Sequence, residues 1–262
     1  MRIDEREVYL VIGASSDVAL AYIRHIATKY RKNCKYPPLV LAHYFSNREI
    51  LTSLAAELPS IELIPIQADL RDENQALKLV LQVEKYVKYP HYILHFPAMK
   101  FDYMRYRELN TDYLRLELNV QLYAFLVVTR AFLPLMHKDY GNRVLVMLSS
   151  YVEDDIPPKF MPDYIIAKYA LLGAMKSAAA EYGGKNLKIN AISPIMMDTK
   201  FLEKMDPHIK ELTVMKSSIG RIPRPEELVP YIDEMLDSAY MKNGFNQLID
   251  ETCFESEESE ND

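Results

Sequence analysis

Short apolar runs alternate with helical patterns along almost the whole chain. Seven runs have the length and composition of strands, at residues 7–13, 37–45, 61–70, 91–98, 142–150, 187–195 and 245–250. The segments between them repeat apolar residues at three- and four-residue spacing, which is typical of helices. Strands that are apolar on both faces and alternate with helices predict a parallel sheet covered by helices on both faces. Because such crossovers are right-handed, we expect a single doubly wound α/β domain with about seven strands.

The chain shows no internal repeat and no linker, so residues 1–252 are predicted to form one domain. A single α/β domain of this size is common, and the sequence has 262 residues. Residues 253–262 are rich in glutamate and serine and poor in apolar residues. We predict that they form a disordered acidic tail.

Charge and composition argue against several classes of protein. The net charge of -6 disfavours nucleic-acid binding, which normally needs a basic face. No uninterrupted apolar run approaches the roughly 20 residues of a membrane span, so no membrane association is expected. The start "MRIDEREVYLVIG" lacks the basic-then-apolar order of a signal peptide. We therefore expect a cytoplasmic protein, and no cluster of ligands suggests a metal site.

Tyr164 and Lys168 lie one helical turn apart after the fifth apolar run, downstream of Ser149 and Ser150. Residues at this spacing share a helix face. Such a pair also occurs commonly among ordinary exposed residues of a helix. A free tyrosine has a pKa of about 10, and a neighbouring ammonium group lowers the pKa of a phenol. Lys168 would thus bring the pKa of the Tyr164 hydroxyl towards the pH range in which a general acid/base works best.

The first apolar run ends in "GASSDVA", residues 13–19. Gly13 permits a tight turn into the next helix, whose N-terminus favours a phosphate group. The hydroxyl groups of Ser15 and Ser16 could donate further hydrogen bonds. Asp17 opposes this reading, because its carboxylate repels a phosphate unless it turns outward or caps the helix.

In this order, the motifs resemble those of the classical short-chain dehydrogenase/reductase family over about residues 7–250, and most of all its 3-oxoacyl-carrier-protein reductases. The resemblance implies a Rossmann-type domain and hydride transfer between a nicotinamide cofactor and a carbonyl or alcohol. It gives catalytic roles to Ser150, Tyr164, Lys168 and Asn119, with Ser149 as the second choice of serine. The interval from Ser150 to Tyr164 is about one residue longer than is usual in the family.

The resemblance also implies a set of cofactor-binding residues. They are Gly13, Ser15, Ser16, Val18, Ser46, Asn47, Arg48, Asp69, Leu70, Pro97, Ala98, Pro194, Ile195 and Thr199. The stretch "HYFSNRE" has no acid before Glu49 to hold a ribose hydroxyl, and Ser46, Asn47 and Arg48 suit a 2′-phosphate, so NADP(H) is favoured over NAD(H). Arg48 could instead solvate a helix start, and Asp69 could instead cap the helix that follows it.

Two functions therefore stay open. The first is an NADP(H)-dependent oxidoreductase of the ketone or 3-oxoacyl reductase type, with Tyr164 as general acid/base and a small carbonyl compound, alcohol or acyl thioester as substrate. The second is a cofactor-binding regulatory protein with little or no turnover. Asp17 and Ile195 favour the second function, because they stand where the family usually has glycine. The resemblance further implies a homo-oligomer, either a tetramer or a dimer.

Overall fold

The computed structural model describes residues 6–30, 35–100, 103–203 and 205–255. Its strands are β1 (Val8–Ile12), β2 (Leu39–Tyr44), β3 (Glu62–Gln67), β4 (Tyr92–His95), β5 (Asn142–Met147), β6 (Leu187–Pro194) and β7 (Asn246–Ile249). Its α-helices are α1 (Asp17–Thr28), α2 (Arg48–Glu57), α3 (Glu73–Glu84), α4 (Thr111–Leu118), α5 (Ala124–Met136), α6 (Pro162–Tyr182), α7 (Pro207–Lys216) and α8 (Val229–Leu236).

All seven strands form one parallel sheet in the order β3-β2-β1-β4-β5-β6-β7. Tyr9 of β1 pairs with Val40 of β2 on one side and with Tyr92 of β4 on the other. The chain winds outward from β1 to β3 and then crosses back to β4, so the direction of winding reverses between β1 and β4. The predicted fold class is confirmed, and ligands of such sheets bind at the carboxyl ends of the strands near this switch point.

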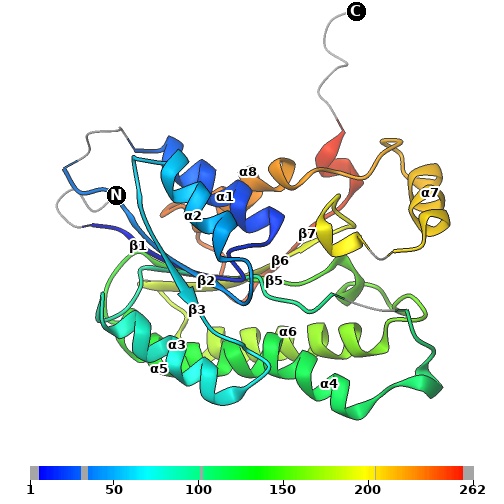
Figure 1. The fold of residues 1–262 in the computed structure, drawn as a ribbon, viewed down its shortest axis with the longest axis horizontal. Helices are drawn as coiled ribbons and strands as arrows, with labels where there is room; N and C mark the ends of the chain where they lie inside the picture. Colours follow the sequence, from blue (N-terminus) through cyan, green and yellow to red (C-terminus); the bar gives the residue numbers. More distant parts are fainter. Residues whose placement is uncertain (1–5, 31–34, 101–102, 204, 256–262) are drawn as a thin grey trace, which may run out of the picture.

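Helices cover both faces of the sheet (Figure 1). Because successive side chains of a strand point to opposite faces, Val8, Leu10 and Ile12 pack into one core while Tyr9 and Val11 pack into the other. Helices α3, α5 and α6 bury their apolar residues in the first core, and α1, α2 and α8 in the second.

The helical segment before β5 is longer and less regular than the sequence predicts. It begins at Thr111, where Asn110 caps α4, and a π-helical turn from Asn119 to Tyr123 joins α4 to α5. The continuous helix Thr111–Met136 is long and apolar enough to cross a membrane, by length and composition alone. The sequence analysis missed this property because it counted uninterrupted apolar runs. The helix packs on one face of the sheet, in contact with α3 and α6, and this burial accounts for the same composition.

The C-terminal boundary of the domain lies beyond the predicted residue 252. Cys253 and Phe254 belong to the short helix η6 (Glu251–Phe254), and Phe254 is buried. The phenol of Tyr231 donates to the Cys253 carbonyl at 2.5 Å. These two residues are therefore part of the fold, and the part of the predicted tail from residue 256 onward lies outside the described residues.

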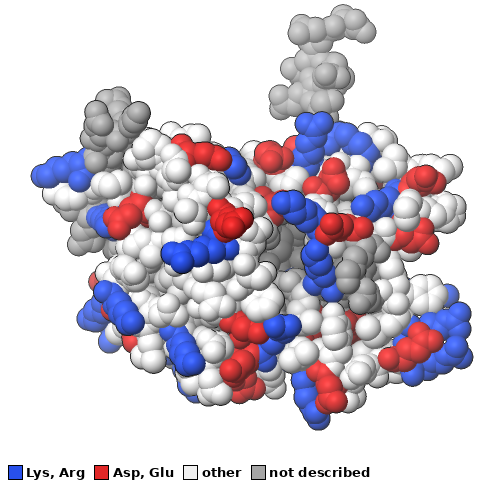
Figure 2. Space-filling view, in the orientation of Figure 1, with Lys and Arg blue, Asp and Glu red and all other residues white. Residues whose placement is uncertain are grey.

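Basic and acidic side chains are interspersed over the face shown in Figure 2.

Candidate active site

The carboxyl ends of β1 and β4 meet at Gly13. Its φ of +79° lies in the left-handed region, and a Cβ there would lie 3.0 Å from the Pro97 nitrogen, so only glycine fits. The Gly13 N–H donates to Nδ1 of His43 at 3.1 Å. The other ring nitrogen, Nε2, therefore carries the proton and bonds the Ala68 carbonyl at 3.1 Å. Burial lowers the pKa of His43 to about 4, so a neutral histidine holds the turn. The sequence analysis did not identify it.

Helix α1 begins directly after this turn. The Ser16 hydroxyl caps the helix by accepting from the Ala19 amide at 3.4 Å. Asp17 is the first helical residue, and its carboxylate accepts from the backbone N–H of Lys200 at 2.7 Å. Asp17 thus does not cap the helix. It bridges instead to the segment that follows β6, while Ser15 and Val18 lie half-buried beside it.

The segment after β2 carries the residues predicted to contact a 2′-phosphate. Ser46, Asn47 and Arg48 are all exposed. Asn47 caps α2 through a hydrogen bond from the Ile50 amide at 3.4 Å, and Arg48 is the first residue of that helix. The predicted trio therefore lies together at the carboxyl edge of the sheet, with the Asn47 side chain already used as a cap.

Asp69 and Arg71 form an ion pair after β3. Arg71 Nε lies 2.9 Å from Asp69 Oδ1, and Arg71 Nη2 lies 2.7 Å from Asp69 Oδ2. The hydrogen bonds from Arg71 hold the pKa of Asp69 below its usual value. The Arg71 guanidinium also lies 4.5 Å from the centre of the Phe45 ring, and so adds a cation to the end of β2 that the sequence analysis missed. Its only signal in the sequence was its place directly after "ADL".

The structure corrects two predictions about the turn after β3. The cap of α3 is Asp72, which accepts from the following helix, so the alternative reading of Asp69 as the cap was wrong. Leu70, predicted to lie beside the cofactor, is buried in the core.

The remaining residues predicted to bind the cofactor lie at the same edge of the sheet. Pro97 and Ala98 follow β4, Pro194 ends β6, and Ile195 and Thr199 come next. The Ile195 amide donates to a carbonyl of β7 at 3.0 Å. The Thr199 hydroxyl donates to a carbonyl of its own loop at 3.4 Å. Both donors named for the cofactor are thus engaged within the protein.

Tyr164 and Lys168 lie one turn apart near the start of α6, with Lys168 Nζ 5.4 Å from the centre of the Tyr164 ring. A side-chain hydrogen bond joins Tyr164 to Ser149. Ser150 opens the short helix η3 (Ser150–Val152), so the structure favours Ser149, the second choice of serine. Lys168 Nζ donates to the Met147 carbonyl at 2.8 Å, which fixes the lysine at the end of β5.

Burial controls the charge states of this pair. It raises the pKa of Tyr164 well above its usual value, and the hydrogen bond with Ser149 only partly offsets this. Burial lowers the pKa of Lys168 to about 8. The pKa of Tyr164 is thus raised, contrary to the expectation from its spacing to Lys168, because removing water from a phenolate is costly. In this structure Lys168 directs a proton to Met147 instead.

The fourth predicted catalytic residue faces elsewhere. The Asn119 side chain donates to the backbone carbonyl of Arg71 at 2.7 Å, so the structure does not support its predicted link to Lys168. Glu117 is the polar residue of this helix that interacts with Lys168. The sequence analysis missed Glu117, although an acid followed four residues later by Gln121 in an apolar helix was a usable signal.

An apolar cluster covers Tyr164. Phe201 packs on the tyrosine, with the ring centres 5.7 Å apart. The cluster comes from the start of α6, the segment after β6 and the loop before α4, and it comprises Tyr103, Tyr151, Met161, Tyr164, Ile165, Met196, Phe201, Leu202, Met205 and Ile209.

The site offers a dinucleotide several matching contacts and one obstacle. The close approach at Gly13, the N-terminus of α1 and the cations Arg48 and Arg71 fit such a group. The hydrogen bond between Asp17 and Lys200 joins the start of α1 to the segment after β6, although β4 and β5 separate β1 from β6 in the sheet. The residues therefore fit a nicotinamide dinucleotide, provided that it displaces this bridge.

The histidines at the two ends of β4, His91 at the amino end and His95 at the carboxyl end, have structural partners. His91 Nδ1 accepts from the Val8 amide at 3.0 Å, and His95 Nε2 bonds the Gln121 carbonyl at 2.7 Å. Within the described part of the chain, no three His, Cys, Asp or Glu side chains gather as a metal ion would require.

Comparison with known proteins places the chain among enzymes of related sequence and fold. A sequence model of the family described as enoyl-(acyl carrier protein) reductase matches residues 38–238. The 3-oxoacyl-[acyl-carrier-protein] reductase FabG of Thermotoga maritima is 30% identical over 115 residues, which are 44% of this chain and 46% of that protein. The chain thus spans less than half the length of this curated relative.

Solved structures agree in fold. A short-chain dehydrogenase from Burkholderia cenocepacia in complex with NADP has a TM-score of 0.81 at 19% identity, covering 97% of this chain and 100% of its own. A blue fluorescent protein from a metagenomic library in complex with NADPH has a TM-score of 0.81 at 20% identity, covering 95% of this chain and 98% of its own. These likenesses concern the fold alone.

Proposed function

Because the chain belongs to the classical short-chain dehydrogenase/reductase family, we propose that it is an NADP(H)-dependent oxidoreductase that interconverts a carbonyl and an alcohol. The observation that carries this proposal is the meeting of Ser149, Tyr164 and Lys168 at the end of β5. A hydroxyl, a phenol and an ammonium group at one buried point supply a hydrogen-bond donor, a proton donor and a cation.

The roles of these residues follow from their contacts. The bound nicotinamide dinucleotide supplies or takes the hydride. Ser149 donates to the substrate oxygen and orients it beside the Tyr164 hydroxyl. Tyr164 then protonates that oxygen in the reducing direction, and Lys168 stabilises the phenolate that remains. The high pKa of Tyr164 keeps the phenol protonated near neutrality, which suits its role as the acid in reduction.

The cover over Tyr164 suggests the substrate class. Met161, Met196 and Phe201 are apolar and adaptable in shape. Such a cover suits a ketone or an acyl thioester better than a charged sugar. We propose substrates of the ketone or 3-oxoacyl type on this basis.

The preference for NADP(H) rests on the exposed cations at the end of β2. Arg48 begins α2, and Arg71 lies over Phe45, so two guanidinium groups are available to a 2′-phosphate. Titration with NADPH and NADH, followed by nicotinamide fluorescence, tests this. We expect tighter binding of NADPH, and Arg48→Ala should remove the difference. Equal affinities in the unmodified protein would overturn the preference.

A second candidate function has its own observation. The hydrogen bond between Asp17 and Lys200 places a carboxylate at the start of α1, where a phosphate group would bind, which favours a regulatory protein that binds the cofactor weakly and turns over little. Binding of NADPH without oxidation by any member of a broad carbonyl panel would support this function over the first.

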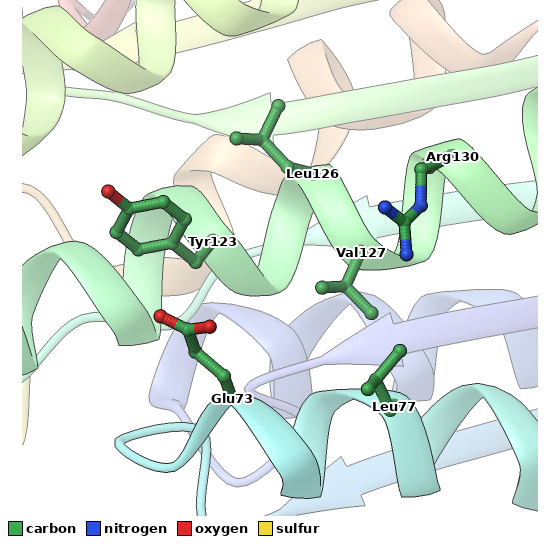
Figure 3. A pocket seen from close by; sticks show the side chains of 6 residues that line it. All are labelled: Glu73, Leu77, Tyr123, Leu126, Val127 and Arg130. Carbon is green, nitrogen blue, oxygen red and sulfur yellow. The ribbon is translucent and has the colours of Figure 1, made fainter.

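We also propose that the chain forms a homo-oligomer through α5 and α6. Tyr123 of the π-helical turn, Leu126 of α5, and Ile166 and Tyr169 of α6 are exposed although they are large and apolar. A surface pocket lies between α3 and α5 (Figure 3), lined by Glu73, Leu77, Tyr123, Leu126, Val127 and Arg130. Exposed apolar surface of this kind is typical of protein interfaces. Analytical ultracentrifugation should show a dimer or tetramer, and a monomer at every concentration would contradict the proposed oligomer.

We also propose that the protein is located in the cytoplasm.

A further inference from the structure

Glu117 is a buried acid in the last turn of α4. Its exposed fraction is 2%, and a buried carboxylate is costly unless charged or hydrogen-bonding groups compensate it. The π-helical turn Asn119–Tyr123 follows it directly. Turns of this kind are rare in helices and frequently mark functional sites.

The helix turns Glu117 and Asn119 to different sides. Residues two apart on a helix do not face each other. Asn119 bonds the Arg71 carbonyl, whereas Glu117 accepts from the Met99 amide at 3.4 Å and from the side-chain amide of Gln121. Helix α4 packs against α6, and Lys168 of α6 is buried like Glu117, so the charges of the two side chains act on each other.

We propose that Glu117 is the positioning residue that sets the charge state of Lys168, and through it the proton supply to Tyr164. This inference rests on the proposed oxidoreductase function. In reduction, Tyr164 gives its proton to the substrate oxygen, the Lys168 ammonium gives one to the phenolate, and the Glu117 carboxyl gives one to the lysine amine. The Glu117 carboxylate then takes up a proton from solvent before the next turnover.

The two side chains are matched for such an exchange. Burial raises the pKa of Glu117 to about 7, opposed by the Gln121 hydrogen bond and the charge of Lys168. Burial lowers the pKa of Lys168 to about 8, opposed by the charge of Glu117. Both groups therefore change charge near neutrality, where an ordinary glutamate and an ordinary lysine would both be fully ionised.

Gln121 can hydrogen-bond both forms of the acid. Its Nε2 donates to the carboxylate. Its Oε1 is buried without a hydrogen-bond partner among the described residues, so a rotated side-chain amide can accept from the carboxylic acid.

Other titratable groups face the pair. Asp163 and Tyr164 of α6 interact with Glu117. His95 of β4 lies near Lys168, and burial lowers its pKa to about 3, so it stays neutral over the pH range of interest.

The first test is the pH dependence of kcat/KM for carbonyl reduction. Loss of the ammonium proton of Lys168 should cause the alkaline fall in rate. Glu117→Gln keeps the shape of the side chain but removes its charge, so this fall should move to lower pH by roughly one unit. Glu117→Asp should restore it in part. The matched control Asn119→Ala should leave its position unchanged. The proposal is overturned if kcat/KM falls at the same alkaline pH in Glu117→Gln as in the unmodified protein. It is also overturned if Asn119→Ala shifts the pH of this fall as much as Glu117→Gln does.

The second test needs no turnover and so separates this inference from the proposed function. The melting temperature at pH 7.5, between the pKa of Glu117 (about 7) and that of Lys168 (about 8), is measured for the unmodified protein, Lys168→Met, Glu117→Gln and the double variant. Removing Lys168 leaves a buried carboxylate without its cation, so Lys168→Met should lower the melting temperature, by on the order of 5 °C. Most of this loss should vanish in the Glu117→Gln background. Equal losses in both backgrounds would show that the two residues are not coupled.

Discussion

The unfolding free energy of this protein should depend on pH through Glu117. Its pKa is raised from 4.5 to about 7 by burial, so the folded state holds this proton more tightly than the unfolded state. The contribution of the group to stability is fully present below pH 4.5 and is lost as pH rises through 7. A difference of 2.5 units at 1.36 kcal/mol each amounts to about 3 kcal/mol.

Glu117→Gln isolates this effect, because glutamine has the same shape and does not titrate. Urea unfolding of both proteins between pH 5 and 7.5 gives the free energies. This range lies below the pKa of Lys168, about 8. The unmodified protein should lose about 2 kcal/mol of this total relative to the variant as pH rises across the window. A difference that stays flat would refute the claim that Glu117 is buried beside Lys168 with a raised pKa.

Three further predictions concern the site itself. Asp17→Gly removes a carboxylate that bridges to the segment after β6, so the Kd for NADPH, measured by fluorescence titration, should fall roughly tenfold; an unchanged Kd would show that the bridge does not obstruct the cofactor. Arg71→Ala should weaken binding of NADPH more than that of NADH in the same titration, and equal weakening would assign Arg71 a purely structural role. Ser149→Ala should lower kcat by about 10²–10³-fold, because it removes the donor next to Tyr164, whereas Ser150→Ala should have a much smaller effect; the reverse order would restore Ser150 to the catalytic role.

The fold could be predicted because its determinants are local. Each strand is a short apolar run, each helix has an apolar face, and the order of the elements leaves few topologies. The turn at Gly13 follows from the same pattern, since a strand, a glycine and a helix start occur in sequence.

The site was predicted less completely, because its details depend on contacts between distant segments. Whether Ser149 or Ser150 reaches Tyr164 depends on where the backbone leaves β5 and enters η3. Whether Glu117 or Asn119 faces Lys168 depends on how α4 is rotated and where the π-helical turn lies. Neither can be obtained from spacing alone.

The Asp17 bridge illustrates the same limit. The sequence shows an acid where a phosphate is expected, and it predicts a cap or an outward orientation. The observed partner, the backbone N–H of Lys200, is 183 residues away, so only the assembled sheet brings the two together.

Reduction of carbonyl compounds by NADPH tests the account most directly. The assay follows NADPH oxidation with a panel of apolar ketones and 3-oxoacyl thioesters, for the unmodified protein and for Tyr164→Phe, after NADPH binding has been measured for both. We predict turnover of at least one compound by the unmodified protein, and a loss of about 10²–10⁴-fold in Tyr164→Phe with NADPH binding retained. Equal rates in the two proteins, or binding without any oxidation by the unmodified protein, would contradict the proposed function.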